Sequence, residues 1–331
     1  MLTTFVGSRK TDSLAGSPVP ARLENEREGF VDAEDGTRIF YRVAGEGPPV
    51  VLCDGILCDG FVWKYLRPAL ARSHRVVHWH YRGHGRSGRP RDPNRIHIRD
   101  HASDLWRVVD GVGGIDRVAL AGHSMGTQVC LEGYRAHPER TAGMILVCGS
   151  YGRITRTFHG TDALAKILPV VLEFRAQYPR LFRGMLALTP TKIALAIARM
   201  SREIDPIRTR TEDMLPYFEH LSGMDPEVFL RMLEAAGTHS AEDLLRSVRT
   251  PTLVVAAELD GFTPPRLAEQ MADMIDGAEF TLVSEGSHSV PIEQPELVNA
   301  RVEKFLSERV YGAQVPTPPP RLLVRDAKES A

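Results

Sequence analysis

Three residue types that cooperate in nucleophilic catalysis occur in this sequence in one order: a serine, then an aspartate, then a histidine. Ser124 lies within Gly122–Gly126, and Asp260 and His288 each follow a later apolar run. A serine hydroxyl is a weak nucleophile near neutral pH, and a histidine that is oriented by an acid can activate it. His288 is the only histidine after Asp260. We therefore predict that Ser124, Asp260 and His288 are catalytic residues.

The segment around Ser124 has the pattern of a strand, a tight turn and a helix. The apolar run 118–121 predicts a short buried strand, and residues 128–134 predict the opening of a helix. G-x-S-x-G between a strand and a helix is typical of a nucleophile elbow. Gly122 and Gly126 lack a side chain where a Cβ would collide with a neighbouring element. Taken alone, the Gly122–Gly126 motif has an alternative interpretation as an ordinary glycine-rich turn.

The two partners of the serine also have plainer interpretations. Asp260 can be a turn or helix-cap residue, and His288 can be a polar loop residue. Glu258 is the alternative acid, although it lies closer to the preceding strand. The required chain order of serine, acid and histidine favours the catalytic interpretation.

Acyl transfer by such a serine also needs donors for the oxyanion. We expect these donors to be the backbone N–H of Met125, at the start of the helix after Ser124, and that of Ile56, in the loop after Cys53. His123, between Gly122 and Ser124, completes the predicted elbow.

Apolar runs alternate with helical patterns on both sides of Ser124. This alternation predicts a mostly parallel sheet of about eight strands with helices on both faces, and polar residues at the carboxyl ends of its strands. Between about 151 and 249 only helical patterns occur, including 163–177, 192–200, 214–221 and 227–236, which predicts a helical cap inserted after the sixth strand. The predicted organisation is a flexible N-terminal arm (1–27), a core (28–150 and 250–310), the cap (151–249) and a Pro-rich C-terminal tail (311–331).

Composition excludes several functional classes. The chain has 331 residues, and its net charge of −1 gives no electrostatic reason to bind nucleic acid or an anionic membrane. No apolar run approaches the length of a membrane span, and no secretory signal opens the sequence, so we expect a cytoplasmic protein. The four cysteines form no zinc-like pattern, and a metal at His78, His80 and His84 is the less favoured interpretation. We expect neither a metal nor a cofactor.

Four motifs together resemble the α/β-hydrolase fold superfamily, in its capped esterase, lactonase and iminopeptidase-like branch. They are Arg82–Ser87, Gly122–Gly126, Glu258–Pro264, and His288 followed by Glu293–Glu296. The resemblance covers about residues 29–309 apart from the cap. It implies the α/β-hydrolase fold and the same three catalytic residues, and it does not define the substrate.

Two positions depart from the pattern of this superfamily. Its members usually carry His-Gly where this chain has Asp54-Gly55, and aspartate where His80 stands. We hypothesise that Asp54 and His80 pair near the site, because a lone buried charge costs several kcal/mol. If Asp54 instead pointed at Ser124, it would affect the oxyanion loop and the usual ester chemistry.

The sequence thus predicts a cofactor-free serine hydrolase that cleaves a carboxylic ester or lactone of a small, largely apolar substrate through an acyl-enzyme. A cap rich in apolar residues favours such a substrate, and it holds five of the ten methionines: Met185, Met200, Met214, Met224 and Met232. Hydrolysis of a C–C bond, amidase or iminopeptidase activity, and perhydrolysis use the same triad and remain alternatives. A small-molecule receptor on a hydrolase scaffold is the alternative from another class. The sequence does not predict the oligomeric state.

Overall fold

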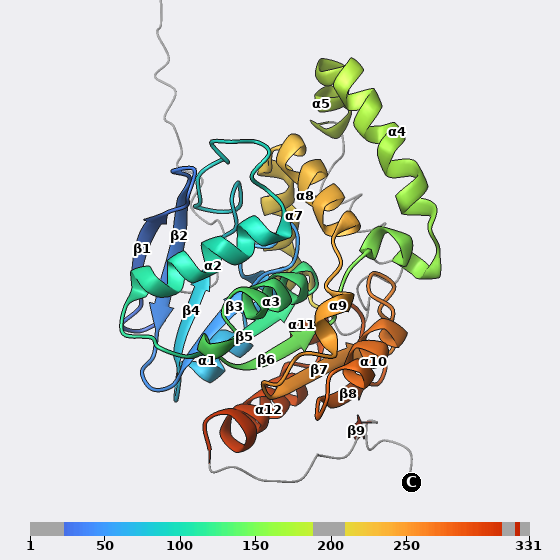
Figure 1. Ribbon diagram of the computed structural model, residues 1–331. Coiled ribbons are helices and arrows are strands. Elements are labelled where there is room, and N and C mark those ends of the chain that lie inside the picture. The colour runs from blue at the N-terminus through green and yellow to red at the C-terminus, as the bar shows by residue number, and fades with distance from the viewer. Residues whose placement is uncertain (1–22, 188–208, 313–321, 325–331) are drawn as a thin grey trace, which may run out of the picture.

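A twisted sheet with helices on both faces and a helical cap forms the structure (Figure 1). The computed structural model describes residues 23–187, 209–312 and 322–324. The helix predicted at 192–200, most of the predicted N-terminal arm and most of the Pro-rich tail lie outside these residues.

The described residues form one nine-stranded sheet, in the order β1-β2-β4-β3-β5-β6-β7-β8-β9. Only β2 runs antiparallel to its neighbours β1 and β4, and every other pair is parallel. The strands from β3 to β7 are almost wholly buried, which explains their continuous apolar runs. The strands are β1 (Arg27–Asp32), β2 (Arg38–Ala44), β3 (Pro49–Cys53), β4 (Arg75–Trp79), β5 (Val118–His123), β6 (Thr141–Val147), β7 (Thr252–Ala257), β8 (Glu279–Val283) and β9 (Leu322–Val324).

The predicted fold class is confirmed, with one strand more than expected. The additional strand, β9, comes from the Pro-rich tail and pairs in parallel with β8, with Leu322 opposite Thr281. Its three residues are too short a run to predict a strand from periodicity.

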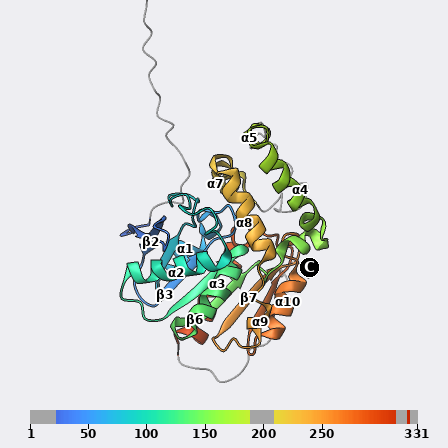
Figure 2. The same ribbon diagram turned by 45° about the horizontal axis from the view of Figure 1, so that its top comes forward.

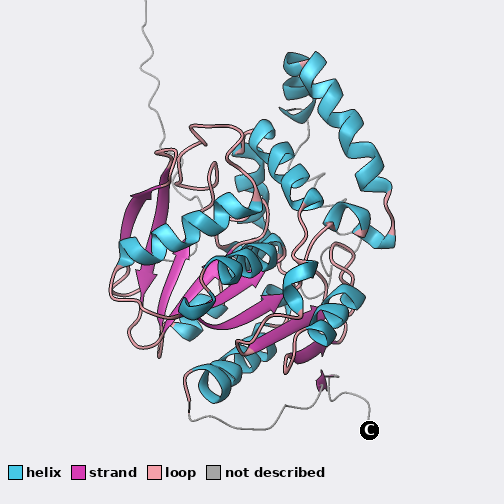
Figure 3. Ribbon diagram, in the orientation of Figure 1, coloured by secondary structure: helices cyan, strands magenta, loops and turns pink. Residues whose placement is uncertain are grey.

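Helices cover both faces of the sheet and enclose two hydrophobic cores (Figure 3). The first core lies against helices α2 (Ile98–Val112), α3 (Met125–Ala136), α9 (Glu242–Leu245) and α10 (Pro265–Met274). The second lies against α1 (Leu66–Leu70), the short helix η1 (Phe61–Trp63), α11 (Val290–Glu293) and α12 (Pro295–Phe305).

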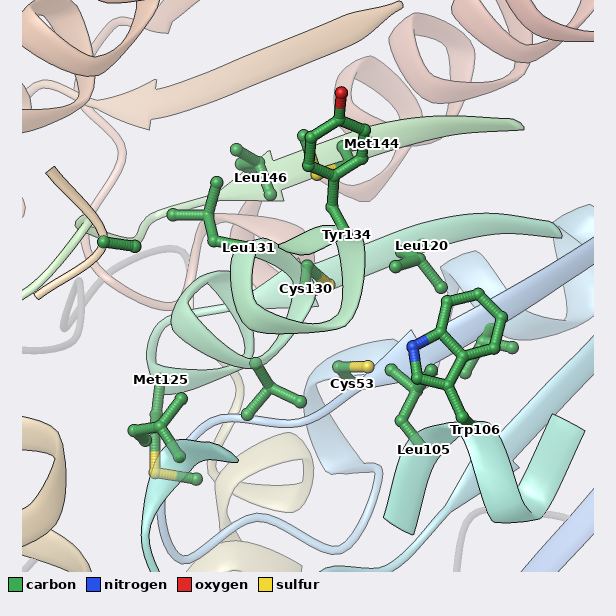
Figure 4. Packing of buried hydrophobic residues seen from close by; sticks show 14 of the residues in the cluster. Cys53, Leu105, Trp106, Leu120, Met125, Cys130, Leu131, Tyr134, Met144 and Leu146 are labelled. Atoms are coloured by element: carbon green, nitrogen blue, oxygen red, sulfur yellow. The ribbon is translucent and has the colours of Figure 1, made fainter. Parts of the chain in front are cut away.

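Helix α3 is held firmly in the first core. Figure 4 shows Cys130 and Leu131 of α3 in one cluster with Leu120 of β5 and Trp106 of α2. The indole N–H of Trp106 donates to the carbonyl of Gly133 at 3.0 Å. The helix that begins after Ser124 is therefore fixed on a rigid base.

The cap lies between β6 and β7 in the chain, at the carboxyl edge of the sheet. Its longer described helices are α4 (Ala163–Gln177), α5 (Pro179–Ala187), α7 (Thr211–Gly223) and α8 (Pro226–Thr238), and the short α9 that follows them packs in the first core. Helices α7 and α8 adjoin the core, whereas α4 and α5 stand away from it in both views (Figures 1 and 2). In the described ranges, no helix combines the length and apolar character that crossing a membrane requires.

Candidate active site

The turn between β5 and α3 holds Ser124 in a strained backbone conformation, with φ 55° and ψ −119°. The turn is closely packed on both sides. A Cβ on Gly122 would lie 2.3 Å from the carbonyl oxygen of Gly126, and one on Gly126 would lie 2.2 Å from that of Cys53. Glycine is therefore required at both positions, and the turn has the geometry of a nucleophile elbow.

The structure brings Asp260 and His288 together, although 28 residues separate them in the chain. Nδ1 of His288 lies 3.0 Å from Oδ1 and 2.9 Å from Oδ2 of Asp260. A carboxylate only accepts hydrogen bonds, so Nδ1 carries the proton. The lone pair of a neutral His288 is then on Nε2, the nitrogen that a general base of this type uses.

The carboxylate of Asp260 is buried and held by its own loop. Its Oδ1 accepts from the backbone N–H groups of Phe262 and Thr263, both at 2.9 Å. The Thr263 hydroxyl lies 2.8 Å from Oδ2 and 2.8 Å from the carbonyl oxygen of Cys148 at the end of β6. These contacts fix the plane of the carboxylate, and with it the orientation of His288.

The imidazole of His288 lies between two other rings. Its centroid is 4.9 Å from that of His123 and 4.8 Å from that of Phe262. His123 also donates from Nε2 to the carbonyl oxygen of His288 at 2.9 Å, and burial lowers the pKa of His123 to about 3. Because His123 directly precedes Ser124, this contact fixes the histidine loop beside the elbow. Within the described chain, no hydrogen bond joins the Ser124 hydroxyl to His288.

The two predicted oxyanion donors lie on neighbouring elements, since Cys53 at the end of β3 pairs with Gly122 of β5. Among the described residues, the N–H groups of Ile56 and Met125 have no hydrogen-bond acceptor. Neither N–H is therefore committed to another group in this part of the structure.

His84 holds the oxyanion loop, residues 54–58, and the sequence did not identify this role. Its Nε2 accepts from the N–H of Leu57 at 3.2 Å, and its Nδ1 lies 3.0 Å from the carbonyl oxygen of Arg82. Burial lowers the pKa of His84 to about 3, so the ring is neutral and can accept at Nε2. The hydroxyl of Tyr81 donates to the carbonyl oxygen of Asp54 at 2.8 Å.

The hypothesis that Asp54 pairs with His80 is wrong. Oδ2 of Asp54 lies 2.9 Å from Nε2 of His78. Pairing of β3 with β4 ends at Leu52 opposite His78. Asp54, two residues beyond, therefore reaches back to His78 instead of continuing the register to His80.

His80 has a separate structural role. Its Nδ1 accepts from the N–H of Arg86 at 2.9 Å, and its carbonyl oxygen accepts from the hydroxyl of Ser87 at 2.7 Å. These bonds fold the Arg82–Ser87 loop. The three histidines considered as metal ligands are buried, and no metal-ligand cluster occurs among the described residues.

Glu293 supports the loop that carries His288, a second role that the sequence did not identify. Its Oε2 accepts from the N–H of Ser287 at 2.8 Å, and its Oε1 accepts from the hydroxyl of Thr209 at 3.0 Å. Thr209 precedes α7, so this buried carboxylate joins the cap to the histidine loop. Only the spacing of Glu293 from His288 hinted at such a contact.

Comparison with known families identifies the fold. A family model described as "alpha/beta hydrolase fold" matches residues 48–295, about three quarters of the chain.

Several relatives are described as hydrolases or esterases. The chain is 27% identical over 282 residues to a putative carbamate hydrolase, RutD, of Azorhizobium caulinodans, covering 82% of this chain and 95% of that protein. Among solved structures, it is similar to Est816, described as an N-acyl homoserine lactone degrading enzyme, with 26% identity and a TM-score of 0.65. The match covers 84% of this chain and 100% of Est816. A thermophilic esterase from Thermogutta terrifontis has the same fold, with 24% identity and a TM-score of 0.70. The match covers 85% of this chain and 98% of the esterase.

Proposed function

Because the chain belongs to the α/β-hydrolase fold family and is an enzyme of hydrolase type, we propose that it cleaves a carboxylic ester or lactone of a small, largely apolar substrate. In this proposal Ser124 is the nucleophile, His288 the general base and Asp260 the acid that orients it. The observation that carries the proposal is the double contact of His288 Nδ1 with Asp260, at 3.0 and 2.9 Å.

The reaction follows from the positions of the protons. Asp260 keeps the Nδ1 proton of His288 in place, so Nε2 accepts the proton of Ser124 as the hydroxyl attacks the carbonyl carbon. The resulting imidazolium is stabilised by the Asp260 carboxylate. His288 then returns the proton to the leaving alcohol, and a water molecule, activated in the same way, releases the acid from Ser124.

The negative charge of the tetrahedral intermediate requires fixed donors. The N–H groups of Met125 and Ile56 are the proposed pair, and two such donors can each lower the barrier by about 3 kcal/mol. Tyr81 and His84 hold the loop that carries Ile56. The donors are therefore fixed before the substrate arrives.

The cap supports an apolar substrate. Tyr217 of α7 packs on Phe61 of η1 with ring centroids 4.9 Å apart, immediately after the oxyanion loop. Met214 and Met232 are buried, and Met224 is half-buried against the core, whereas Met200 and the side chain of Met185 lie outside the described residues. Such surfaces favour an apolar acyl or alcohol group.

Cleavage of a carbamate is the second candidate, because a putative carbamate hydrolase aligns with 82% of this chain. The same three residues would attack a carbamate carbonyl. Comparing kcat/KM for an ester and a carbamate with the same p-nitrophenol leaving group separates the candidates.

A fluorophosphonate probe tests the proposal directly, since it labels an activated serine. We expect the wild type to be labelled and to hydrolyse p-nitrophenyl esters, with the best acyl length revealed by a series from acetate to octanoate. Ser124→Ala should abolish both activities, and Ser103→Ala on α2 should abolish neither. A folded wild type without labelling or turnover would contradict the proposal and favour a small-molecule receptor.

A further inference from the structure

A buried cluster of ionisable side chains lies behind the oxyanion loop, and the reaction described above makes no use of it. Asp54 is 1% exposed, His78 is 0% exposed and Arg42 is 3% exposed. They come from the oxyanion loop, β4 and β2 respectively. Burial of this kind is expensive unless the groups are paired or neutral.

The hydrogen bonds within the cluster show which nitrogen atom of His78 carries a proton. Nε of Arg42 donates to Nδ1 of His78 at 3.0 Å. A guanidinium only donates, so Nδ1 of His78 carries no proton and a neutral ring carries it on Nε2. That N–H then donates to Oδ2 of Asp54 at 2.9 Å. Asp54 is therefore bonded to a neutral imidazole and not to a cation.

The other oxygen of Asp54 is unsatisfied. Oδ1 is buried and has no hydrogen-bond partner among the described residues. A carboxylate with one neutral donor and no bonded cation is poorly stabilised away from water, whereas a carboxylic acid loses much less on burial. The surroundings thus favour the protonated form.

The backbone of Asp54 adjoins the two segments that carry the proposed oxyanion donors. It stands two residues before Ile56 in the same loop. Its carbonyl oxygen would lie 2.7 Å from a Cβ on Gly126, which places the Asp54 backbone against the start of α3, next to Met125. A charge on this buried residue, two positions from Ile56, would therefore act on the site where the oxyanion forms with little screening by water.

We propose that Asp54 is a buried carboxylic acid that must keep its proton for the oxyanion site to work, so that its ionisation limits acyl transfer in alkaline solution. The inference rests on the proposed function. An ionised Asp54 would oppose the negative charge that Ile56 and Met125 stabilise, in a buried region where water screens it poorly. Asp54 is thus a positioning residue, not one that touches the substrate.

Burial raises the pKa of Asp54 to about 8, although the charge of Arg42, the nearby indole N–H of Trp63 and the charge of His220 act to lower it. Burial also lowers the pKa of Arg42, to about 10, so the guanidinium stays charged as Asp54 ionises. His220 comes from α7 of the cap, where its Nδ1 lies 3.7 Å from Oδ2 of Asp59. Asp54 is therefore the group expected to change charge between neutral and moderately alkaline pH.

Most of the other ionisable neighbours of Asp54 do not change charge in this pH range. Burial lowers the pKa of His78 and His80 well below the usual range, so both stay neutral. Burial raises the pKa of the Cys58 thiol and of the Tyr81 hydroxyl well above their usual ranges, so both stay protonated. Burial raises the pKa of Asp59 as well, which makes Asp59 the necessary control.

The first measurement is kcat/KM for a short p-nitrophenyl ester, from about pH 6 to about pH 10, in the wild type, Asp54→Asn and Asp59→Asn. For the wild type we expect a fall of about tenfold from the plateau near pH 7 to pH 9. Asparagine copies the neutral acid, so Asp54→Asn should lack this alkaline fall, whereas Asp59→Asn should keep it. A flat wild-type profile, or an alkaline fall that persists in Asp54→Asn, would overturn the proposal.

The second measurement does not depend on turnover. Infrared difference spectra should show the C=O stretch of a protonated carboxylic acid in the wild type near neutral pH, absent in Asp54→Asn. Absence of this band from the wild type would overturn the proposal, whatever the activity of the protein. A band without ester turnover contradicts only the proposed substrate, and the pH profile of fluorophosphonate labelling then replaces the kinetic test.

If Asp54→Asn does not fold, His78→Leu replaces it. This variant removes the N–H that donates to Asp54, so the alkaline fall in kcat/KM should move to higher pH. A fall that stays at the same pH would count against the proposal.

Discussion

The ring of Phe262 lies 4.8 Å from the imidazole of His288, with the two planes tilted by 32°. The backbone N–H of Phe262 also donates to Oδ1 of Asp260 at 2.9 Å. One residue thus orients the acid through its backbone and packs against the base through its side chain. The loop after β7 therefore supplies both the acid and one wall of the histidine site.

The first prediction concerns this ring. Phe262→Leu keeps the backbone donor but removes the aromatic face beside the imidazolium, an interaction of about 1 kcal/mol. We expect kcat/KM for a p-nitrophenyl ester to fall about three- to tenfold, mostly in kcat. Phe158→Leu alters a ring that packs on Phe262, with centroids 4.9 Å apart, and should have the smaller effect on kcat. Equal losses in the two variants would contradict a role for Phe262 at the imidazole.

The second prediction concerns the acid. Asp260→Asn preserves size but removes the charge and changes which tautomer of His288 is favoured, and we expect kcat to fall about 10⁴-fold. Glu258→Gln is the matched control, because Glu258 is exposed and, among the described residues, its carboxylate accepts one hydrogen bond, from the N–H of Glu285 at 3.0 Å. Steady-state kinetics on one ester separate the two. If Glu258→Gln lost the activity and Asp260→Asn kept it, Glu258 would be the acid.

Much of this arrangement could be predicted from the sequence because it depends on local patterns. A glycine-flanked serine between an apolar run and a helical pattern predicts a strained turn, and Ser124 indeed has φ 55°. Asp260 and His288 follow predicted strands in the order that this fold requires, and the structure brings them together. Parallel strands place such residues at one edge.

The contacts behind the oxyanion loop could not be predicted, because they depend on where strand pairing ends. Extending the β3–β4 register would place Asp54 opposite His80, but the pairing stops at Leu52 and Asp54 meets His78. Likewise, the sequence contains His84 but does not reveal that its Nε2 accepts from Leu57. These contacts depend on ring rotations within a packed core, which leave no periodic signal.

The third prediction concerns the packing of the elbow. A Cβ on Gly126 would lie 2.2 Å from the carbonyl oxygen of Cys53, a backbone atom that cannot move without shifting β3. We therefore expect Gly126→Ala to lower the free energy of unfolding by about 3 kcal/mol or more. Gly223→Ala is the control, since none of the described residues places an atom within 4 Å of its Cβ position on α7. Urea titrations followed by circular dichroism measure both, and equal stability of the two variants would contradict close packing at Gly126.

The last prediction is the pH dependence of stability that Asp54 imposes. Burial raises the pKa of Asp54 to about 8 in the folded chain, whereas an unfolded aspartate has a pKa near 4. Between these values the folded state binds one proton more than the unfolded state, so the contribution of Asp54 to stability falls as pH rises. Four pKa units correspond to about 5 kcal/mol across this range.

Asparagine cannot ionise, so Asp54→Asn should gain stability relative to the wild type as pH rises from about 5 to about 8. Urea unfolding at several pH values measures this difference, and comparing the two proteins cancels the contribution of every other titrating group. Asp110→Asn, at a surface carboxylate that pairs with Arg140 at 2.8 Å, should leave the pH dependence as in the wild type. If the difference in free energy of unfolding between Asp54→Asn and the wild type stayed constant with pH, Asp54 would already be ionised in the folded protein. Only a proton that Asp54 keeps on folding makes this difference depend on pH.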